Sequence, residues 1–173
     1  MPAGLFLSFL ADSVLWGTMY KLNLPEFDFK LRKAEGKVWI FDGIRKKYIV
    51  LTPEEWVRQH FIHYLVSDKK YPRSLIRVEG GLIFNELQKR SDIVVYNRRG
   101  QPWMIVECKA PTLPVSPSTL SQASLYNSSL KAEYICLTNG LVHLCAHIDW
   151  IERKTTQLDD TPPFPDFLPG PSC

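Results

Sequence analysis

The chain has 173 residues, of which 45% are hydrophobic and 23% are charged, and its formal net charge is +3 at pH 7. This length is enough for one domain with a substantial core, and the composition is that of a soluble globular protein. The nearly balanced charge excludes a strongly basic field over the whole molecule, so a nucleic-acid surface would have to be a local patch. No apolar run is long enough to span a membrane, and we expect no membrane partner.

Residues 1–18 are predicted to be an extension that precedes the domain, which begins near Met19. The stretch is apolar and carries Asp12 in its middle, and it lacks the basic start and the small-residue cleavage site of a signal peptide. A short amphipathic helix that docks on a partner is the alternative for these residues.

The next segment has patterns typical of half-buried strands. Residues 27–32 alternate between apolar and polar, and the runs 38–41 and 48–51 flank Asp42-Gly43, which is a hairpin signal. We therefore expect a β-hairpin extension before the core. Basic side chains surround these strands, either as a solvated face that opposes aggregation or as a track for a phosphate backbone. They are Lys30, Arg32, Lys33, Lys37, Arg45, Lys46 and Lys47.

A helix is predicted to begin after Thr52 and to continue to about residue 66. Thr52 is the expected N-cap and Pro53 the first helical residue, and Glu55 completes a capping box. This gives Glu55 a structural explanation. Glu54 leans toward the apolar stripe, with Arg58 one turn further on, although a first-turn acid that interacts with the helix dipole explains it as well.

Two paired strands follow this helix, after shorter strands expected at 75–79 and 82–84. The apolar run 93–96 is joined by the turn 97–100 to the run 103–108. Strands connected in this way pair antiparallel. Asp92, which precedes the first run, should therefore lie near the far end of the second.

That far end carries an acid and a base two residues apart. Glu107 and Lys109 share one face of the strand, because side chains at i and i+2 point the same way. An uncompensated charge in an apolar central strand is costly and normally has a task. This pair is the strongest functional signal in the sequence.

A second helix is expected after a proline-rich loop. Ser116 or Ser118 can cap it, and it should continue to about residue 130, with Gln122 and Tyr126 on one face because they are four residues apart.

The chain is then predicted to form strands at 134–138 and 141–145 and to end in a disordered, proline-rich tail at 159–173. The histidines in this region, His143 and His147, are interpreted as structural groups rather than metal ligands, since isolated histidines beside strand residues are usually hydrogen-bonded.

The cysteines lack the spacing of a zinc site. Cys108, Cys136 and Cys145 lie inside apolar, strand-like runs, so we expect reduced core residues of a cytoplasmic protein.

Carboxylates that converge from two strands can hold Mg²⁺, which prefers oxygen ligands and retains waters that a phosphate can replace. Such a site can activate water and stabilise the charge on a scissile phosphate. Lys109 beside it could position or deprotonate the water, or offset the phosphate charge.

The ordered pattern Asp92, Glu107-Cys108-Lys109 and Gln122-x-x-x-Tyr126 resembles the PD-(D/E)xK nuclease superfamily, with Ser91 in place of the proline. The span from about Met19 to Trp150 is similar to the N-terminal domain of type I restriction enzyme R subunits, in a short stand-alone form. The segments that carry this closer resemblance are 51–59, 90–96, 106–111, 122–127 and 138–140.

This resemblance implies an α/β fold with a restriction-endonuclease-like αβββαβ core, whose mixed central sheet is flanked by helices, over residues 19–158. It implies Mg²⁺- or Mn²⁺-dependent cleavage of DNA, with Asp92 and Glu107 as metal ligands and Lys109 as the catalytic lysine. Glu54, four residues before Arg58, becomes a further acid at the metal. The residues that it implies support the active site or contact DNA are Gln122, Tyr126 and Arg58.

Two other functions stay open. A nuclease fold can serve as a non-catalytic DNA-binding or assembly module, although intact Asp92, Glu107 and Lys109 favour the enzyme. The charges could also form a structural ion-pair network, which leaves Gln122 and Tyr126 without a role. The chain has no room for the translocase that follows this domain in full R subunits, so a helicase, translocase or specificity protein is an expected partner beside DNA.

Overall fold

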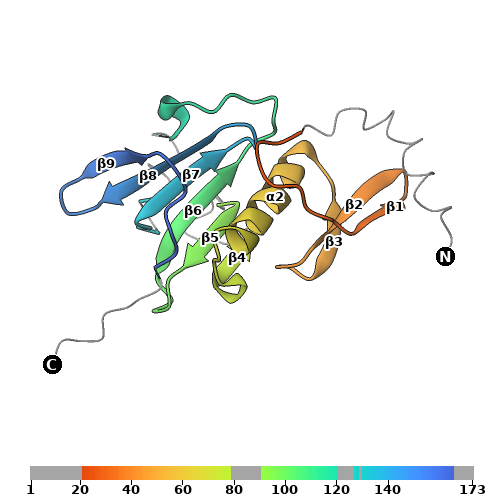
Figure 1. The fold of residues 1–173 in the computed structure, drawn as a ribbon, viewed down its shortest axis with the longest axis horizontal. Coiled ribbons are helices and arrows are strands. Elements are labelled where there is room, and N and C mark those ends of the chain that lie inside the picture. Colours follow the sequence, from red (N-terminus) through yellow and green to blue (C-terminus); the bar gives the residue numbers. More distant parts are fainter. Residues whose placement is uncertain (1–20, 79–90, 121–126, 129, 166–173) are drawn as a thin grey trace, which may run out of the picture.

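The computed structural model describes residues 21–78, 91–120, 127–128 and 130–165. Figure 1 shows its elements in sequence colours. The strands and helices are β1 (Leu31–Ala34), β2 (Lys37–Asp42), β3 (Lys47–Val50), α2 (Pro53–Ser67), η2 (Arg73–Leu75), β4 (Ile76–Val78), β5 (Ile93–Tyr96), β6 (Pro102–Cys108), β7 (Tyr134–Thr138), β8 (His143–Asp149) and β9 (Lys154–Leu158).

The strands form two sheets. The smaller is antiparallel, in the order β1-β2-β3, and the larger has six strands in the order β4-β5-β6-β7-β8-β9. The larger sheet is mixed, because β6 and β7 are parallel while its other neighbours are antiparallel. The order of elements along the chain is α2, the strands β4 to β6, the first turn of a helix at 117–120 and then β7. This order confirms the predicted αβββαβ core and mixed central sheet.

Helix α2 lies between the two sheets (Figure 1). The Thr52 side chain accepts a hydrogen bond from the Glu55 amide at 3.1 Å, and Pro53 occupies the first turn. Both features of the predicted helix start are therefore confirmed. Val57, Phe61 and Leu65 are fully buried and form the stripe that packs on the large sheet.

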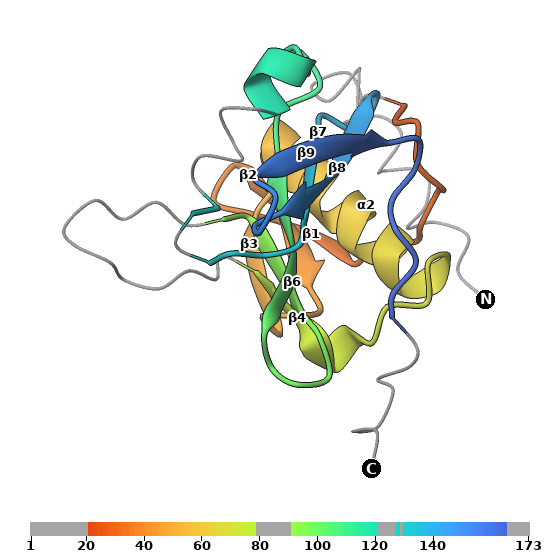
Figure 2. The ribbon, with the colours of Figure 1, turned by 90° about the vertical axis from the view of Figure 1, so that its left-hand side faces the viewer.

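The core has two parts, one on each face of the large sheet. Along β5, Ile93 and Val95 pack on the α2 side, while Val94 belongs to the second cluster with Ile105 and Leu120. Figure 2 shows α2 and the helical start at 117–120 on different sides of the strands. Because both faces of β6 are covered, its run Trp103 to Val106 is apolar without interruption.

Several boundaries differ from the prediction. Of the strand predicted at 27–32, the last two residues belong to β1, which begins at Leu31, while Phe27 and Phe29 pack against the rings of His63 and His60 on α2. The expected hairpin becomes a three-stranded sheet. Strand β9 was not predicted, and its polar, exposed sequence explains why. Of the second predicted helix, residues 117–120 are helical, and Ser116 caps them.

Two cysteines correct the expectation of reduced thiols. Cys136 and Cys145 lie directly opposite each other in the antiparallel pair of β7 and β8, and they form a disulfide. Only the register of the two strands reveals this proximity, so the sequence could not. Cys108 is free and buried, as expected.

Residues 159–165 correct the predicted disordered tail. Phe164 is 6% exposed and packs against the rings of Tyr71 and Trp103, and the Tyr71 hydroxyl donates to the Pro162 carbonyl at 2.5 Å. The ring contacts of Phe164 hold this segment in place, although its proline-rich composition indicated disorder.

The extension at 1–18, the strand expected at 82–84, and residues 166–173 lie outside the described residues. Among the helices that the structure describes, none combines the length and the apolar character needed to cross a bilayer.

Candidate active site

The candidate site lies where β5 and β6 meet the first turns of α2. Ile93 pairs with Val106, so Asp92, one residue earlier, lies beside Glu107, as the turn at 97–100 predicted. The Cys108 amide donates to Asp92 Oδ2 at 2.7 Å. This bond fixes one carboxylate oxygen and leaves the other directed at the helix.

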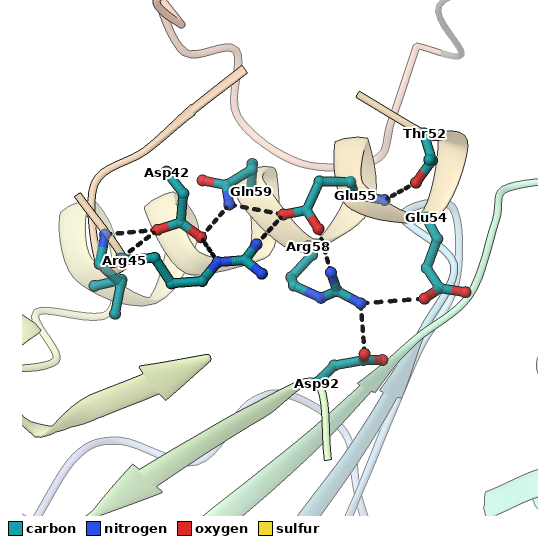
Figure 3. A network of polar contacts seen from close by, with 9 residues as sticks. Asp42, Arg45, Thr52, Glu54, Glu55, Arg58, Gln59 and Asp92 are labelled. Atoms are coloured by element: carbon teal, nitrogen blue, oxygen red, sulfur yellow. Dashed lines mark hydrogen bonds and ion pairs between the residues drawn. The ribbon is translucent and has the colours of Figure 1, made fainter. Parts of the chain in front are cut away.

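Arg58 occupies the space between the helix and the strand (Figure 3). Its Nη2 lies 2.5 Å from Asp92 Oδ1 and 3.1 Å from Glu54 Oε1, and its Nη1 forms an ion pair with Glu55. Burial lowers the pKa of Arg58, but the charges of Asp92 and Glu55 outweigh burial and raise it overall. The guanidinium is therefore a permanent positive charge shared by three acids.

Glu107 is the most perturbed carboxyl group of the site. Burial raises its pKa from 4.5 to about 7, and the negative charge of Asp92 adds to the rise. The positive charge of Lys109 and a hydrogen bond with the Ser91 side chain oppose it. Close to neutral pH, Glu107 can thus exist with or without its proton, as acids in active sites often can.

Glu54 belongs to the same electrostatic group, although its side chain is 43% exposed. Burial raises its pKa, and so does the charge of Asp92, while Arg58 and Lys109 lower it.

Burial and the charge of Asp92 also raise the pKa of Cys108, so this thiol stays protonated and acts as a core residue.

Lys109 follows the end of β6. Its amide donates to the Thr138 carbonyl at 2.8 Å, which ties the backbone here to β7. Its charge lowers the pKa of both Glu107 and Glu54. The Lys109 charge therefore acts on both carboxyl groups.

The structure thus brings together Glu54, Arg58, Asp92, Glu107 and Lys109. Gln122 and Tyr126 lie outside the described residues. His143 is hydrogen-bonded, as predicted: its two ring nitrogens lie 2.7 Å from Thr138 Oγ1 and 3.0 Å from the Asn23 carbonyl oxygen. The ring of His147 packs against that of Tyr134, with 5.1 Å between the centroids.

The roles expected for Glu54 and Glu55 are partly exchanged. Glu55 is 6% exposed, and its carboxylate accepts from Arg45, Arg58 and Gln59 instead of completing the capping box. The first turn therefore directs Glu55 inward and Glu54 toward the edge.

Sequence reasoning missed four members of this charged network. The spacing of Glu55 to Arg58 and Gln59, three and four residues, is a signal that could have been used. Nothing in the sequence indicates that Asp42 and Arg45 contact α2, because only the packing of the small sheet on this helix brings them near Glu55 and Gln59.

The chemistry of the side chains fits a divalent cation. Five acids, Asp42, Glu54, Glu55, Asp92 and Glu107, face three cations, Arg45, Arg58 and Lys109, which leaves two negative charges in excess when all are ionised. Within the described ranges, no group of three His, Cys, Asp or Glu residues is arranged to hold a metal ion. Mg²⁺ generally takes one or two carboxylates and completes its shell with water and phosphate, so Asp92 and Glu107 would suffice.

A comparison with protein-family models places this sequence in a family. The model of the type I restriction enzyme R protein N terminus matches residues 53–162, which is more than half of the chain. Among solved structures, a fragment described as an HsdR subunit of a type I restriction enzyme from Vibrio vulnificus YJ016 is 26% identical, with a TM-score of 0.33. The match covers 50% of this chain and 16% of that one. No curated protein matches. The chain belongs to the family of type I restriction enzyme R protein N-terminal domains.

Proposed function

We propose that this domain is a metal-dependent deoxyribonuclease that hydrolyses phosphodiester bonds of DNA. The observation that carries the proposal is the group of acids around Glu107, whose pKa is raised to about 7 by burial and by Asp92. A fold has no need for such a costly group, and perturbed acids gather at functional sites. Membership of the restriction R-subunit family supports the same reaction class.

Asp92 and Glu107 would hold Mg²⁺ or Mn²⁺, with Glu54 as a further acid. When bound, such an ion supplies charge stabilisation for the phosphate and a more acidic water. The charge of Lys109 acts on both glutamates, and this lysine would orient the attacking water or offset charge on the phosphate. The ion pair with Arg58 fixes the orientation of the Asp92 carboxylate.

DNA is the proposed substrate, and a helicase, translocase or specificity protein is the proposed partner that selects the target. The cytoplasm is the proposed location. Gln122 and Tyr126 are kept as proposed support or DNA-contacting residues.

The test is cleavage of plasmid, linear and single-stranded DNA with Mg²⁺, Mn²⁺ or chelator, beside the variant Lys109→Ala. We expect metal-dependent cleavage and a loss of roughly 10²- to 10⁴-fold in the variant, as for a group that assists proton transfer. A matched control is Lys131→Ala, which removes an exposed lysine from the loop before β7.

Cleavage that is equal in Lys109→Ala and wild type would contradict the proposal. DNA binding without cleavage would instead favour a non-catalytic nuclease fold, the alternative in which Arg58 permanently occupies the acids that it now contacts.

A further inference from the structure

The contacts of the candidate site continue through α2 into the small sheet (Figure 3). They end at the turn between β2 and β3, where Asp42 is fully buried. Asp42 Oδ1 accepts from the amides of Ile44 at 2.7 Å and Arg45 at 2.8 Å, so the carboxylate also closes the turn. This turn lies outside the family match at 53–162.

Arg45 connects this turn to the helix. Its Nε lies 2.6 Å from Asp42 Oδ2, and its Nη2 lies 2.9 Å from Glu55 Oε1. Gln59 makes the same connection, since its Nε2 donates to Asp42 Oδ2 at 2.9 Å and to Glu55 Oε1 at 2.8 Å. Two separate side chains therefore hold Asp42 and Glu55 together.

Glu55 is the junction between the turn and the site. One of its oxygens accepts from Arg45 and the other from Arg58 Nη1. The opposite end of the Arg58 guanidinium reaches Asp92, whose second oxygen is held by the Cys108 amide. The orientation of Asp92 is thus connected, bond by bond, to a turn about fifty residues earlier in the chain.

We propose that Asp42 and Arg45 are positioning residues of the candidate site, which hold Glu55 so that Glu55 aims the Arg58 guanidinium at Asp92. This inference rests on the proposed function for its catalytic meaning. The small sheet is then part of the active site's support and not an independent appendage.

The reason is the cost of leaving a buried charge unpaired. Without Arg45, Glu55 would retain Arg58 as its cation, in a position where its side chain is 7% exposed. It would draw the guanidinium toward itself and away from Asp92, since a buried carboxylate that has lost one of its two cations depends more on the other. Asp92 would then be held by the Cys108 amide and would turn more freely.

The test compares Arg45→Met with Lys47→Met, which removes an exposed lysine from the same hairpin. The first readout is the NMR chemical shift of the Cys108 amide, because this group donates to Asp92. Asp92→Asn supplies the reference for a perturbed bond. We expect Arg45→Met to move the amide signal toward that reference, while Lys47→Met leaves it at the wild-type position.

The second readout is the metal concentration that gives half-maximal cleavage. We expect it to rise by about 10- to 100-fold in Arg45→Met, the usual effect of removing a group that orients a metal ligand. The KM for DNA should stay constant. Arg45→Lys retains the charge but cannot make both contacts, and we expect an intermediate rise.

A folded Arg45→Met protein with the wild-type Cys108 signal and metal requirement would overturn the inference. If Arg45→Met does not fold, Asp42→Asn with the same readouts decides, because it weakens the same connection with little change of shape. If the wild type cleaves no DNA, the proposed function fails, and the Cys108 signal alone still decides whether the turn positions Asp92.

Discussion

The two ends of strand β6 are built on opposite principles. At the first end, the Trp103 ring packs against Tyr134 at 4.9 Å and against Tyr71 and Phe164 at 5.5 Å between centroids. At the other end, Glu107 enters a group of charges, where burial and then the negative charge of Asp92 raise its pKa to about 7. One strand therefore carries both a source of stability and a site that reduces it.

This difference distinguishes residues that stabilise the fold from residues that the folded protein retains although they reduce its stability. The aromatic end gains free energy from buried apolar area and from ring contacts, and it needs no chemistry to explain it. The charged end places acids where burial disfavours their ionised forms. Functional sites commonly break the rules that the rest of a chain obeys.

The largest expected effect is that of Arg58→Met at the charged end. Removal of one partner from a buried ion pair costs about 3–5 kcal/mol, because Glu55 and Asp92 would lose their shared cation. Urea unfolding at pH 8 measures the loss. Arg77→Met, at an exposed arginine of β4, is the control. A loss below about 1 kcal/mol, the usual value of a surface ion pair, would contradict the buried network.

At the aromatic end, Phe164→Ala should lower the free energy of unfolding by about 3 kcal/mol, the lower end of the range for buried phenylalanine. The loss should be equal at pH 5 and pH 8, because Phe164 contacts the rings of Trp103, which does not titrate, and of Tyr71, whose pKa burial raises above its ordinary value of 10. The conservative change Phe164→Leu should cost less than about 1.5 kcal/mol. DNA cleavage should be unchanged in both variants at a temperature where they are folded. A much smaller loss would show that residues 159–165 do not anchor the sheet.

Glu107→Gln should increase stability at pH 8 while it abolishes cleavage. The pKa of Glu107 rises from 4.5 to about 7 on folding, so the folded chain binds its proton more tightly than the unfolded chain. The free energy of unfolding of the wild type should therefore fall as the pH rises through this interval, by about 2 kcal/mol between pH 5 and pH 8. The variant should lack this fall. Chemical unfolding in chelator at both pH values measures it, and parallel pH profiles would contradict the raised pKa.

The sequence was sufficient to predict contacts between residues that are close in the chain or joined by a short turn. The turn at 97–100 sets the register that brings Asp92 beside Glu107, and helical spacing predicts the pair of Glu54 and Arg58. Contacts between segments far apart in the chain were beyond it. The contacts of Asp42 with Gln59 and of Arg45 with Glu55 follow from the packing of a small sheet on a helix, and no local pattern encodes that packing.

The same limit explains the corrections. The disulfide of Cys136 and Cys145 depends on strand register, and the burial of Phe164 depends on contacts with the distant rings of Tyr71 and Trp103. Composition indicated only apolar cysteines and a proline-rich tail. The periods of two residues in strands and 3.6 residues in helices indicate which side chains an element buries, but they do not indicate which other element those side chains contact.

The smallest effect is expected for Thr52→Ala, which removes the side chain that caps α2. The Thr52 hydroxyl accepts from the Glu55 amide at 3.1 Å, and loss of such a cap costs about 1 kcal/mol. Thr52→Ser should keep most of this stability. The informative measurement is the Cys108 amide signal, because the cap and the buried network both act on the first turns of α2. If the network with Asp42 and Arg45 sets the direction of Arg58, Thr52→Ala should reduce stability and leave the signal in place. A signal that moves as far as in Arg45→Met would instead mean that the helix start, and not the small sheet, orients the charged end of β6.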